Sequence, residues 1–513
     1  MSLISRRSFL KSGAVATTMS TLKTVGLGST HSRKNVLFIA VDDQNVSLGC
    51  YGATQIKSPH LDDLAKRGVR FSRAYCQYPL CGPSRASLMT GCSPDTTKIY
   101  DLQTRVRDTM PNAVTLGQLF RKDGYFSARV GKIYHEDVPA DIGHDGLDDP
   151  ATWDYVYNPV GEDRLKDEPL VTNFTPGQTR HDASGYARLG STISFYASPS
   201  SDDVMTDSKG ADEVIRLLRA NKKRPFFIAF GLYRPHVPWI VPQKYFDQYP
   251  VDQIKPRPFD PAELKQAPAP AYTTQPANFG MSEMQCRQAI QAYSASTSFM
   301  DVQVGRVLGE LKSLGLDKNT IVVFWADHGW SLGEHGQWEK LTLFETATHV
   351  PLIFAGPGIN AGQVCQRTVE HLDIYPTLAE LCGLSGTPSS LQGTSLVRLL
   401  KQSDATWDKP AITEVTRPPT REPKVFGYSI RTERYRYTSW QGDTAGEELY
   451  DYETDPGETK NLAAMAEMQP LKANLRSQLD VITLARGRSI PLGKVISRSA
   501  GTSRIQQQSS AES

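Results

Sequence analysis

One cysteine of this chain stands where its chemistry would be unusual. Cys81 comes just before the Pro83-Ser84-Arg85 turn, which opens an apolar helical segment. Proline suits the first helical position, because its missing N–H loses no hydrogen bond there. Free N–H groups and the helix dipole would favour an anion beside Cys81, and Arg85 can reach back from one turn on. The alternative is an ordinary capped helix with a small buried cysteine.

Two apolar runs end in side chains that bind metals. The run 36–41 is followed by Asp42-Asp43, and the run 320–326 is followed by Asp327-His328. Three carboxylates at one edge would repel one another unless a cation lay between them. Oxygen ligands favour Ca²⁺ or Mg²⁺, but imidazole suits calcium poorly, so the residues alone leave zinc open. A solvated turn is the alternative for either pair taken by itself.

Two further apolar runs lead to basic residues. The run 226–230 precedes Arg234-Pro235-His236, and the run 127–130 precedes Gly131-Lys132 and then His135. Continuous β-branched and aromatic runs are typical of strands buried on both faces. Ligands bind outside the carboxyl ends of parallel strands, so these four strand ends predict a single site. A surface lysine or a packed histidine is the alternative for each residue taken alone.

Helical patterns separate these strands. They cover Leu61 to Arg67, Ala113 to Lys122, Asp212 to Asn221, Ala289 to Leu314 and Ile374 to Cys382. This alternation predicts an α/β fold with a large, mostly parallel or mixed sheet between layers of helices. Strand-like runs at 426–432 and 435–440 predict a small antiparallel C-terminal sheet, closed by a helix near 465–484. The Pro/Ala-rich run 256–276 predicts a long surface loop.

Composition excludes several classes of protein. The 513 residues suffice for one large domain and a smaller one. A formal net charge of +2 gives no whole-molecule argument for nucleic acid or an anionic membrane. After the N-terminal region no segment approaches the roughly 20 apolar residues of a membrane span. Seven cysteines are too few for a disulfide scaffold, and no Cys-x-x-Cys metal pair occurs.

The N-terminal residues are predicted to be an export signal. The stretch Ser5-Arg6-Arg7-Ser8-Phe9-Leu10-Lys11 is typical of a twin-arginine motif, and the modest apolar stretch after it is too short and polar for a span. A disordered basic N-terminus is the alternative. We expect a signal at 1–32, a catalytic domain at 33–405, a C-terminal α+β subdomain at 406–490 and a disordered tail at 491–513. The mature protein would be periplasmic or extracellular.

The motif around Cys81 resembles a known signature. Cys81-Gly82-Pro83-Ser84-Arg85, followed by Thr90-Gly91, is similar at every defined position to the signature of the sulfatase family. Other segments resemble, in order, its iduronate-2-sulfatase branch: Val41-Asp42-Asp43, Ser47 to Gly52, Gly131 to His135, Pro235 to Pro238 and Asp327 to Gly336. Many other sulfatases carry Asn where this chain has His328, whereas that branch carries His. The resemblance extends from about Asn35 to Ala463 and is weak between Pro139 and Met205.

The resemblance implies an alkaline-phosphatase-like fold and hydrolysis of sulfate esters. Cys81 would be oxidised to formylglycine (3-oxoalanine) by a formylglycine-generating enzyme, in the cytoplasm before folding and export. The hydrate of that aldehyde would be the nucleophile. One Ca²⁺ would be held by Asp42, Asp43, Asp327, His328 and the modified Cys81.

The resemblance also implies roles for the basic residues. Arg85 would orient the modified residue, and Lys132 and His135 would hold or deprotonate its hydroxyls. His236 and Lys340 would contact the sulfate and the leaving group, with Lys132 also binding substrate. Trp330 is assigned to the substrate site because it follows the metal pair, with a wall or core aromatic as the alternative.

The substrate expected from the resemblance is a sulfated carbohydrate. The branch acts on the 2-O-sulfate of a uronic acid in glycosaminoglycans, which suggests fragments of glycosaminoglycan or algal polysaccharides. A phosphatase or phosphonate monoester hydrolase of the same superfamily is one alternative. A catalytically inactive carbohydrate-binding homologue is another, and in it Cys81 would stay a thiol.

Overall fold

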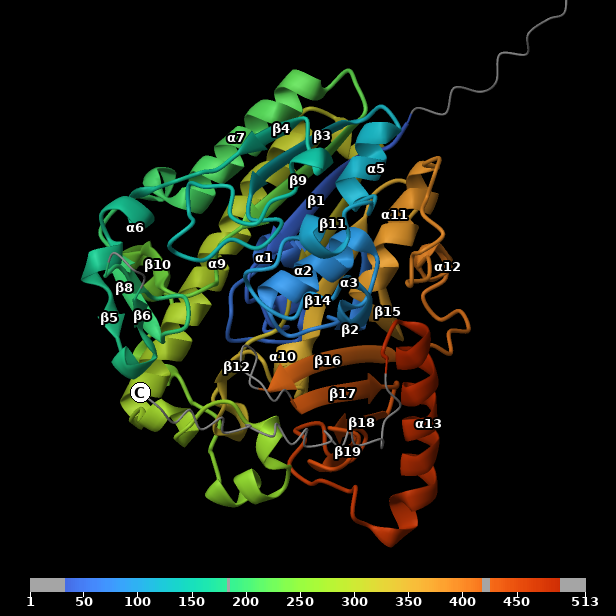
Figure 1. Ribbon diagram of the computed structural model, residues 1–513. Coiled ribbons are helices and arrows are strands. Elements are labelled where there is room, and N and C mark those ends of the chain that lie inside the picture. The colour runs from blue at the N-terminus through green and yellow to red at the C-terminus, as the bar shows by residue number, and fades with distance from the viewer. Residues whose placement is uncertain (1–32, 182–184, 418–424, 490–513) are drawn as a thin grey trace, which may run out of the picture. The chain divides into compact units, whose positions relative to one another are not determined.

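An eight-stranded sheet forms the centre of the computed structural model, which describes residues 33–181, 185–417 and 425–489 (Figure 1). The strand order is β15-β2-β14-β11-β1-β9-β3-β4. Its strands are β1 (Asn35–Val41), β2 (Gly68–Tyr75), β3 (Phe126–Gly131), β4 (Tyr155–Tyr157), β9 (Phe226–Leu232), β11 (Thr320–Ala326), β14 (His349–Ala355) and β15 (Gln363–Glu370). β14 runs antiparallel to β2 and β11, and the other neighbours are parallel. The predicted mixed sheet is confirmed.

Helices cover both faces of this sheet. In α5 (Leu116–Lys122), Phe120 stacks on Phe227 of β9, with ring centroids 4.5 Å apart. In α7 (Thr206–Asn221), Gly210 lies against Phe230 of the same strand. Residues 227 and 230 point to opposite faces because side chains alternate along a strand. Every residue of β1, β9 and β11 is buried, which explains their unbroken apolar runs.

A second, antiparallel sheet follows in the C-terminal part, as predicted. It contains β16 (Ala411–Arg417), β17 (Val425–Arg431), β18 (Tyr435–Trp440) and β19 (Glu447–Asp451) in that order. Helix α13 (Gln469–Ala485) buries Leu475 and Leu479 in a cluster with Ile430 and Tyr437 of the sheet. β16 contacts β2 and β15 of the large sheet, and in Figure 1 the small sheet lies next to α10 (Glu345–Thr348).

The remaining long helices are α1 (Pro59–Lys66), α2 (Cys81–Thr90), α9 (Glu283–Ser313) and α11 (Ile374–Cys382). α9 begins six residues before the expected Ala289, because Ser282 and Gln285 form a reciprocal capping box. α7 begins at Thr206 rather than at Asp212, since Asp163 Oδ1 accepts a hydrogen bond from the Thr206 amide. The Pro/Ala-rich run 256–276 is a loop with short 3₁₀ turns at Pro261–Lys265 and Ala269–Ala271.

Short elements complete the described chain. The helices are α3 (Pro94–Thr97), α4 (Val106–Thr109), α6 (Glu162–Leu165), α8 (Gln243–Phe246) and α12 (Val397–Lys401). The strands are β5 (Thr172–Asn173), β6 (Arg180–His181), β7 (Ala187–Arg188), β8 (Ser194–Ser198), β10 (Trp239–Pro242), β12 (Ser331–Leu332) and β13 (Trp338–Glu339). β10, β8 and β5 form one small sheet, and β12 pairs with β13.

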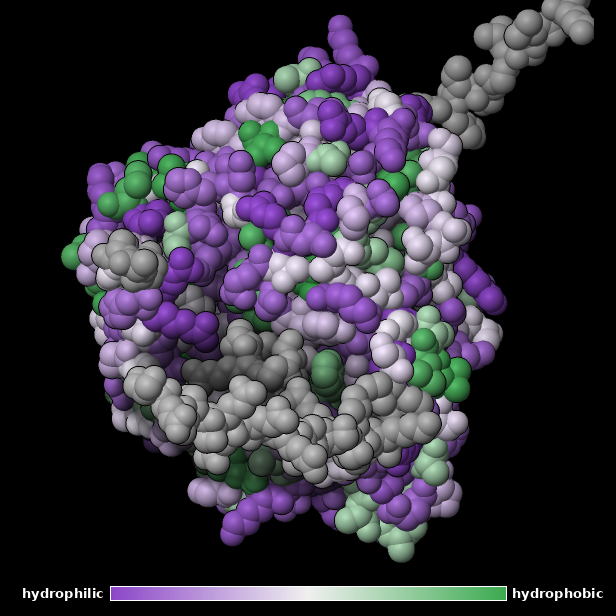
Figure 2. Space-filling model, viewed as in Figure 1, coloured by the Kyte–Doolittle hydropathy of each residue, from purple (hydrophilic) through white to green (hydrophobic). Residues whose placement is uncertain are grey.

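The surface is largely hydrophilic on the face shown in Figure 2, where apolar residues are scattered in small groups. Within the described ranges, no helix combines the length and apolar character needed to cross a membrane. The predicted export signal at 1–32 and the predicted tail at 491–513 lie outside the described residues.

Candidate active site

Three aspartates and a histidine meet at the ends of two neighbouring strands. β1 and β11 are parallel and pair Val41 with Ala326, so the residues that follow them lie side by side. The Asp43 amide donates to Asp327 Oδ1 at 3.1 Å. Asp43 has a left-handed φ of 60°, which turns the chain so that Asp42 and Asp43 both face the cluster. All four side chains are fully buried.

Cys81 joins this cluster from the first position of α2. Its Sγ lies 3.4 Å from Asp42 Oδ1 and 3.2 Å from His328 Nε2. The helix begins two residues before Pro83, so Cys81 itself is the first helical residue. Burial, reinforced by the charge of Asp42, raises the pKa of the Cys81 thiol well above its usual range. An unmodified Cys81 would therefore be a neutral thiol, which is a weak nucleophile.

Three cations surround the carboxylates. Arg85 Nε lies 2.9 Å from Asp327 Oδ2, and its Nη2 lies 3.2 Å from Asp42 Oδ1. Lys132 Nζ contacts Asp42 Oδ2 at 2.6 Å. Lys340 Nζ lies 2.6 Å from Asp43 Oδ1 and 3.2 Å from Cys81 Sγ. Sequence segments far apart thus supply both signs of charge to one enclosed space.

The two carboxylates of the Asp42-Asp43 pair differ electrostatically. Burial opposes ionised Asp42, but the neighbouring charges, with Lys132 the largest and Arg85 and Lys340 among the others, together outweigh it and hold the pKa of Asp42 well below its usual range. Burial, together with the adjacent Asp42, raises the pKa of Asp43 well above its usual range. Asp43 Oδ2 has no hydrogen-bond partner among the described residues. A further positive charge beside Asp43 Oδ2 would therefore favour the ionised form of this carboxylate.

The donor set fits a divalent cation. Ligand atoms of Asp42, Cys81, Asp327 and His328 all lie within 4.8 Å of one another. His328 Nδ1 lies 2.9 Å from the Gly329 carbonyl oxygen and donates to it, because a carbonyl can only accept. Burial lowers the pKa of His328 to about 4, so Nε2 carries a free lone pair toward the cluster.

The other predicted residues lie around this centre. His236 Nε2 is 3.6 Å from Asp43 Oδ2, while its Nδ1 donates to the Val237 carbonyl oxygen at 2.5 Å. Trp330 is 1% exposed and packs on Trp239, with Lys340 Nζ 5.4 Å from its ring centroid. His135 is buried, and its Nδ1 has no partner in the part of the chain that the structure describes. Burial and the nearby charge of Lys132 lower the pKa of His135 well below its usual range.

Sequence reasoning missed residues that hold the cluster from behind. The hydroxyl of Tyr293, on α9, donates to the Asp43 carbonyl oxygen at 3.0 Å and accepts from the Asn45 amide at 2.9 Å. Asn45 Nδ2 in turn donates to the Trp330 carbonyl oxygen. Arg234, which the sequence places after the run 226–230 without a role of its own, donates to the His236 carbonyl oxygen and pairs with Asp163. A tyrosine in mid-helix carries no motif, so no sequence signal identifies Tyr293.

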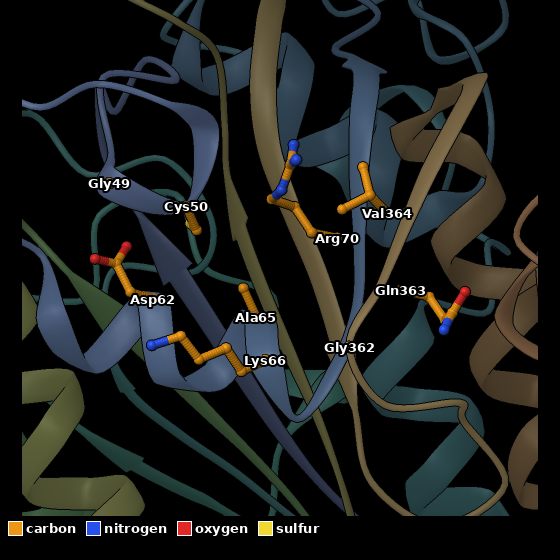
Figure 3. Close-up of a pocket in the computed structure, with 9 residues that line it drawn as sticks. All are labelled: Gly49, Cys50, Asp62, Ala65, Lys66, Arg70, Gly362, Gln363 and Val364. Carbon is orange, nitrogen blue, oxygen red and sulfur yellow. The ribbon is translucent and has the colours of Figure 1, made fainter.

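A separate cavity of about 320 Å³ opens between α1 and strands β2 and β15 (Figure 3). Asp62 and Lys66 line it from α1, and Arg70 and Gln363 line it from the sheet. Figure 3 shows these polar side chains spread apart rather than aimed at a common point. None of the clustered site residues lines this cavity.

Comparison with known proteins identifies similar chains. The family model described as Sulfatase matches residues 34–384, and that for the C-terminal part of N-sulphoglucosamine sulphohydrolase matches residues 333–484. The chain is 35% identical to a sulfatase of Formosa agariphila over 461 residues, covering 86% of each chain. It is 32% identical to human iduronate 2-sulfatase over 518 residues, covering 85% of this chain and 92% of the relative.

The fold is also similar to that of solved structures. The phosphonate monoester hydrolase of Agrobacterium radiobacter superposes with a TM-score of 0.71 at 24% identity, covering 88% of this chain and 96% of that one. At this identity the likeness concerns the fold alone.

Replacing Tyr293 by Phe tests the support behind Asp43. The ring would keep its packing, but the Asp43 carbonyl and the Asn45 amide would lose their partner. We expect affinity for a divalent cation, measured by calorimetric titration, to fall by about 10- to 100-fold. Tyr249→Phe is the matched control, because its hydroxyl contacts the Lys57 amide and Ser298 elsewhere along α9. Unchanged affinity in the Tyr293 variant would contradict this role.

Proposed function

The chain belongs to the sulfatase family and is a sulfuric ester hydrolase, and from this premise we propose that it removes 2-O-sulfate from uronate-containing sugars with a formylglycine at position 81 and one calcium ion. Hydrolysis of sulfate esters on sulfated sugars is the activity that the relatives support. The observation that carries the proposed formylglycine and calcium is a single buried cluster, which contains Asp42, Asp43, Cys81, Asp327 and His328. The choice of 2-O-sulfated uronate rests on the similarity to human iduronate 2-sulfatase.

The nucleophile is proposed to be the hydrate of a formylglycine made from Cys81. A formylglycine-generating enzyme would carry out the oxidation before folding, since Cys81 is 1% exposed in the folded chain. The high pKa of the Cys81 thiol argues against a thiolate nucleophile. The hydrate supplies an oxygen nucleophile at the N-terminus of α2, where the helix dipole favours negative charge.

Calcium is proposed to lie among Asp42, Asp43, Asp327, His328 and residue 81. The oxygen-rich donor set favours this ion, and the lone pair on His328 Nε2 supplies the one nitrogen ligand. When bound, the ion would neutralise charge on the sulfate group. Arg85 pairs with Asp42 and Asp327, which fixes both carboxylates in orientation.

The lysines are proposed to bind the sulfate. Burial opposes the charged form of both lysines, but the surrounding acidic groups together outweigh it. They raise the pKa of Lys132, with Asp42 the largest of them, and raise the pKa of Lys340 well above its usual range, with Asp43 the largest. Both ammonium groups therefore stay charged and would stabilise negative charge as the ester bond breaks. Burial, with the charge of Lys340, lowers the pKa of His236 well below its usual range. Lys340, which stays charged, would therefore stabilise the negative charge on the departing sugar oxygen. His236 and His135, which stay neutral, would accept protons.

Two alternative functions are a phosphonate monoester hydrolase and an inactive sugar-binding homologue. A phosphonate monoester hydrolase shares the fold. The complete Cys-x-Pro-Ser-Arg motif and the spacing of Lys132 and His135 favour sulfate instead. The presence of every charged site residue in one cluster argues against an inactive sugar-binding homologue.

The state of Cys81 tests the nucleophile. Peptide mass spectrometry of active enzyme should find residue 81 lighter than a thiol residue, as the aldehyde requires. Cys81→Ser should lower turnover at least about a thousandfold, because a single hydroxyl leaves a slowly hydrolysed ester. Full activity in a preparation whose Cys81 is an unmodified thiol would refute the proposal.

Ester preference tests the reaction class. With matched aryl esters, kcat/KM for the sulfate should exceed that for the phosphate by at least about a hundredfold, as expected of a member of the sulfatase family. Equal or higher turnover of the phosphate would favour the phosphatase alternative. A panel of sulfated oligosaccharides would then test 2-O-sulfated uronate against other positions of sulfation.

Export by the twin-arginine pathway to the periplasm or medium is also proposed, on the basis of Arg6-Arg7 and the flank that follows. Replacing both arginines by lysine should leave the unprocessed protein in the cytoplasm, which cell fractionation would detect. Normal export of that variant would contradict the proposed route.

A further inference from the structure

The segment that carries Lys340 is held from behind by the C-terminal sheet. Arg417, the last residue of β16, donates from Nη2 to the Leu341 carbonyl oxygen. Arg436 of β18 donates from Nη1 to the Leu343 carbonyl oxygen. Arg431 of β17 pairs with Glu345 at 3.2 Å. Three strands of one sheet therefore contact three residues, Leu341, Leu343 and Glu345, within the five positions after the site lysine.

The backbone around Lys340 needs such support. Glu339 and Leu341, on either side of it, have φ values of 69° and 73°. Side-chain-bearing residues rarely adopt this left-handed conformation, and they keep it only where the surroundings hold it. The Leu341 amide also donates to the Pro79 carbonyl oxygen at 3.0 Å, which ties the segment to the chain just before Cys81. A small movement here would displace the Lys340 ammonium from Asp43 and residue 81.

Arg417 has contacts unlike those of its neighbours in the sheet. Besides Leu341, it donates to the carbonyl oxygens of Pro270 and Thr416, each at 3.1 Å. Within the described chain it forms no ion pair, whereas Arg431 and Arg436 both pair with Glu345. Burial lowers the pKa of Arg417 to about 10. The guanidinium carbon also lies 5.6 Å from the Trp440 ring centroid. Among these contacts, the Leu341 carbonyl is the one next to Lys340 in the chain.

We propose that Arg417 is a positioning residue for Lys340 and acts through the Leu341 carbonyl. The C-terminal sheet thereby sets where the Lys340 ammonium lies relative to Asp43 and residue 81. This inference rests on the proposed role of Lys340 at the sulfate and the leaving oxygen. It gives the C-terminal subdomain a part in turnover although it supplies none of the clustered side chains.

A double-mutant cycle of Arg417→Met and Lys340→Ala tests the proposal on aryl sulfates. Arg417→Met alone should lower kcat about tenfold, and in the Lys340→Ala background it should change kcat by less than about twofold. Equal losses in both backgrounds would overturn the positioning role. A Lys340→Ala variant with wild-type turnover would instead overturn the role of Lys340, and the inference with it. The two failures are therefore distinguishable.

Leaving-group dependence separates positioning from loss of fold. Fewer folded molecules would lower kcat equally for all aryl sulfates, whereas a displaced Lys340 would slow poor leaving groups most. Equal slowing of every ester by Arg417→Met would contradict the proposal, and Arg417→Lys should restore most of the activity. Arg434→Met is the matched control, because Arg434 lies in the turn between β17 and β18 of the same sheet but pairs with Asp451 and Glu453. Its kcat should equal that of the wild type.

Discussion

Mutual repulsion of three buried carboxylates is the constraint around which this molecule is arranged. Asp42, Asp43 and Asp327 share a space without exposure to water, where charges interact strongly. Each needs a cation within contact distance, and the chain provides Arg85, Lys132 and Lys340. Burial, together with the charge of Asp42, raises the pKa of Asp43. A divalent ion beside the carboxylates would favour their ionised forms, and an anionic substrate group would face the positive charge of the ion and the lysines.

The fold meets this constraint by bringing together separate parts of the chain. Parallel pairing of β1 with β11 sets Asp42 beside Asp327. The start of α2 brings Cys81 and Arg85, and the chain after β3 brings Lys132. Lys340 comes from a short hairpin that the C-terminal sheet supports. The site therefore depends on the packing of both sheets, not on the strand ends alone.

The sequence predicts the parts of this arrangement that have local signals. Unbroken apolar runs identified β1, β9 and β11, and polar residues after them identified Asp42 and Asp327. Lys340 lacks such a signal and was assigned by resemblance alone. Tyr293 and Arg417 were missed, because their partners are backbone carbonyls of distant segments. The start of α9 was missed although Ser282 and Gln285 form a capping box, since polar residues there obscured the helical pattern.

The most direct test of the account is an anomalous-scattering map from crystals of the active enzyme grown in calcium. The account predicts one strong peak, ligated by Asp42, Asp43, Asp327, His328 and residue 81, with Lys132 and Lys340 still beside it. A map without a peak among these side chains, or with the ion bound elsewhere, would contradict the claim that the aspartates converge on a cation.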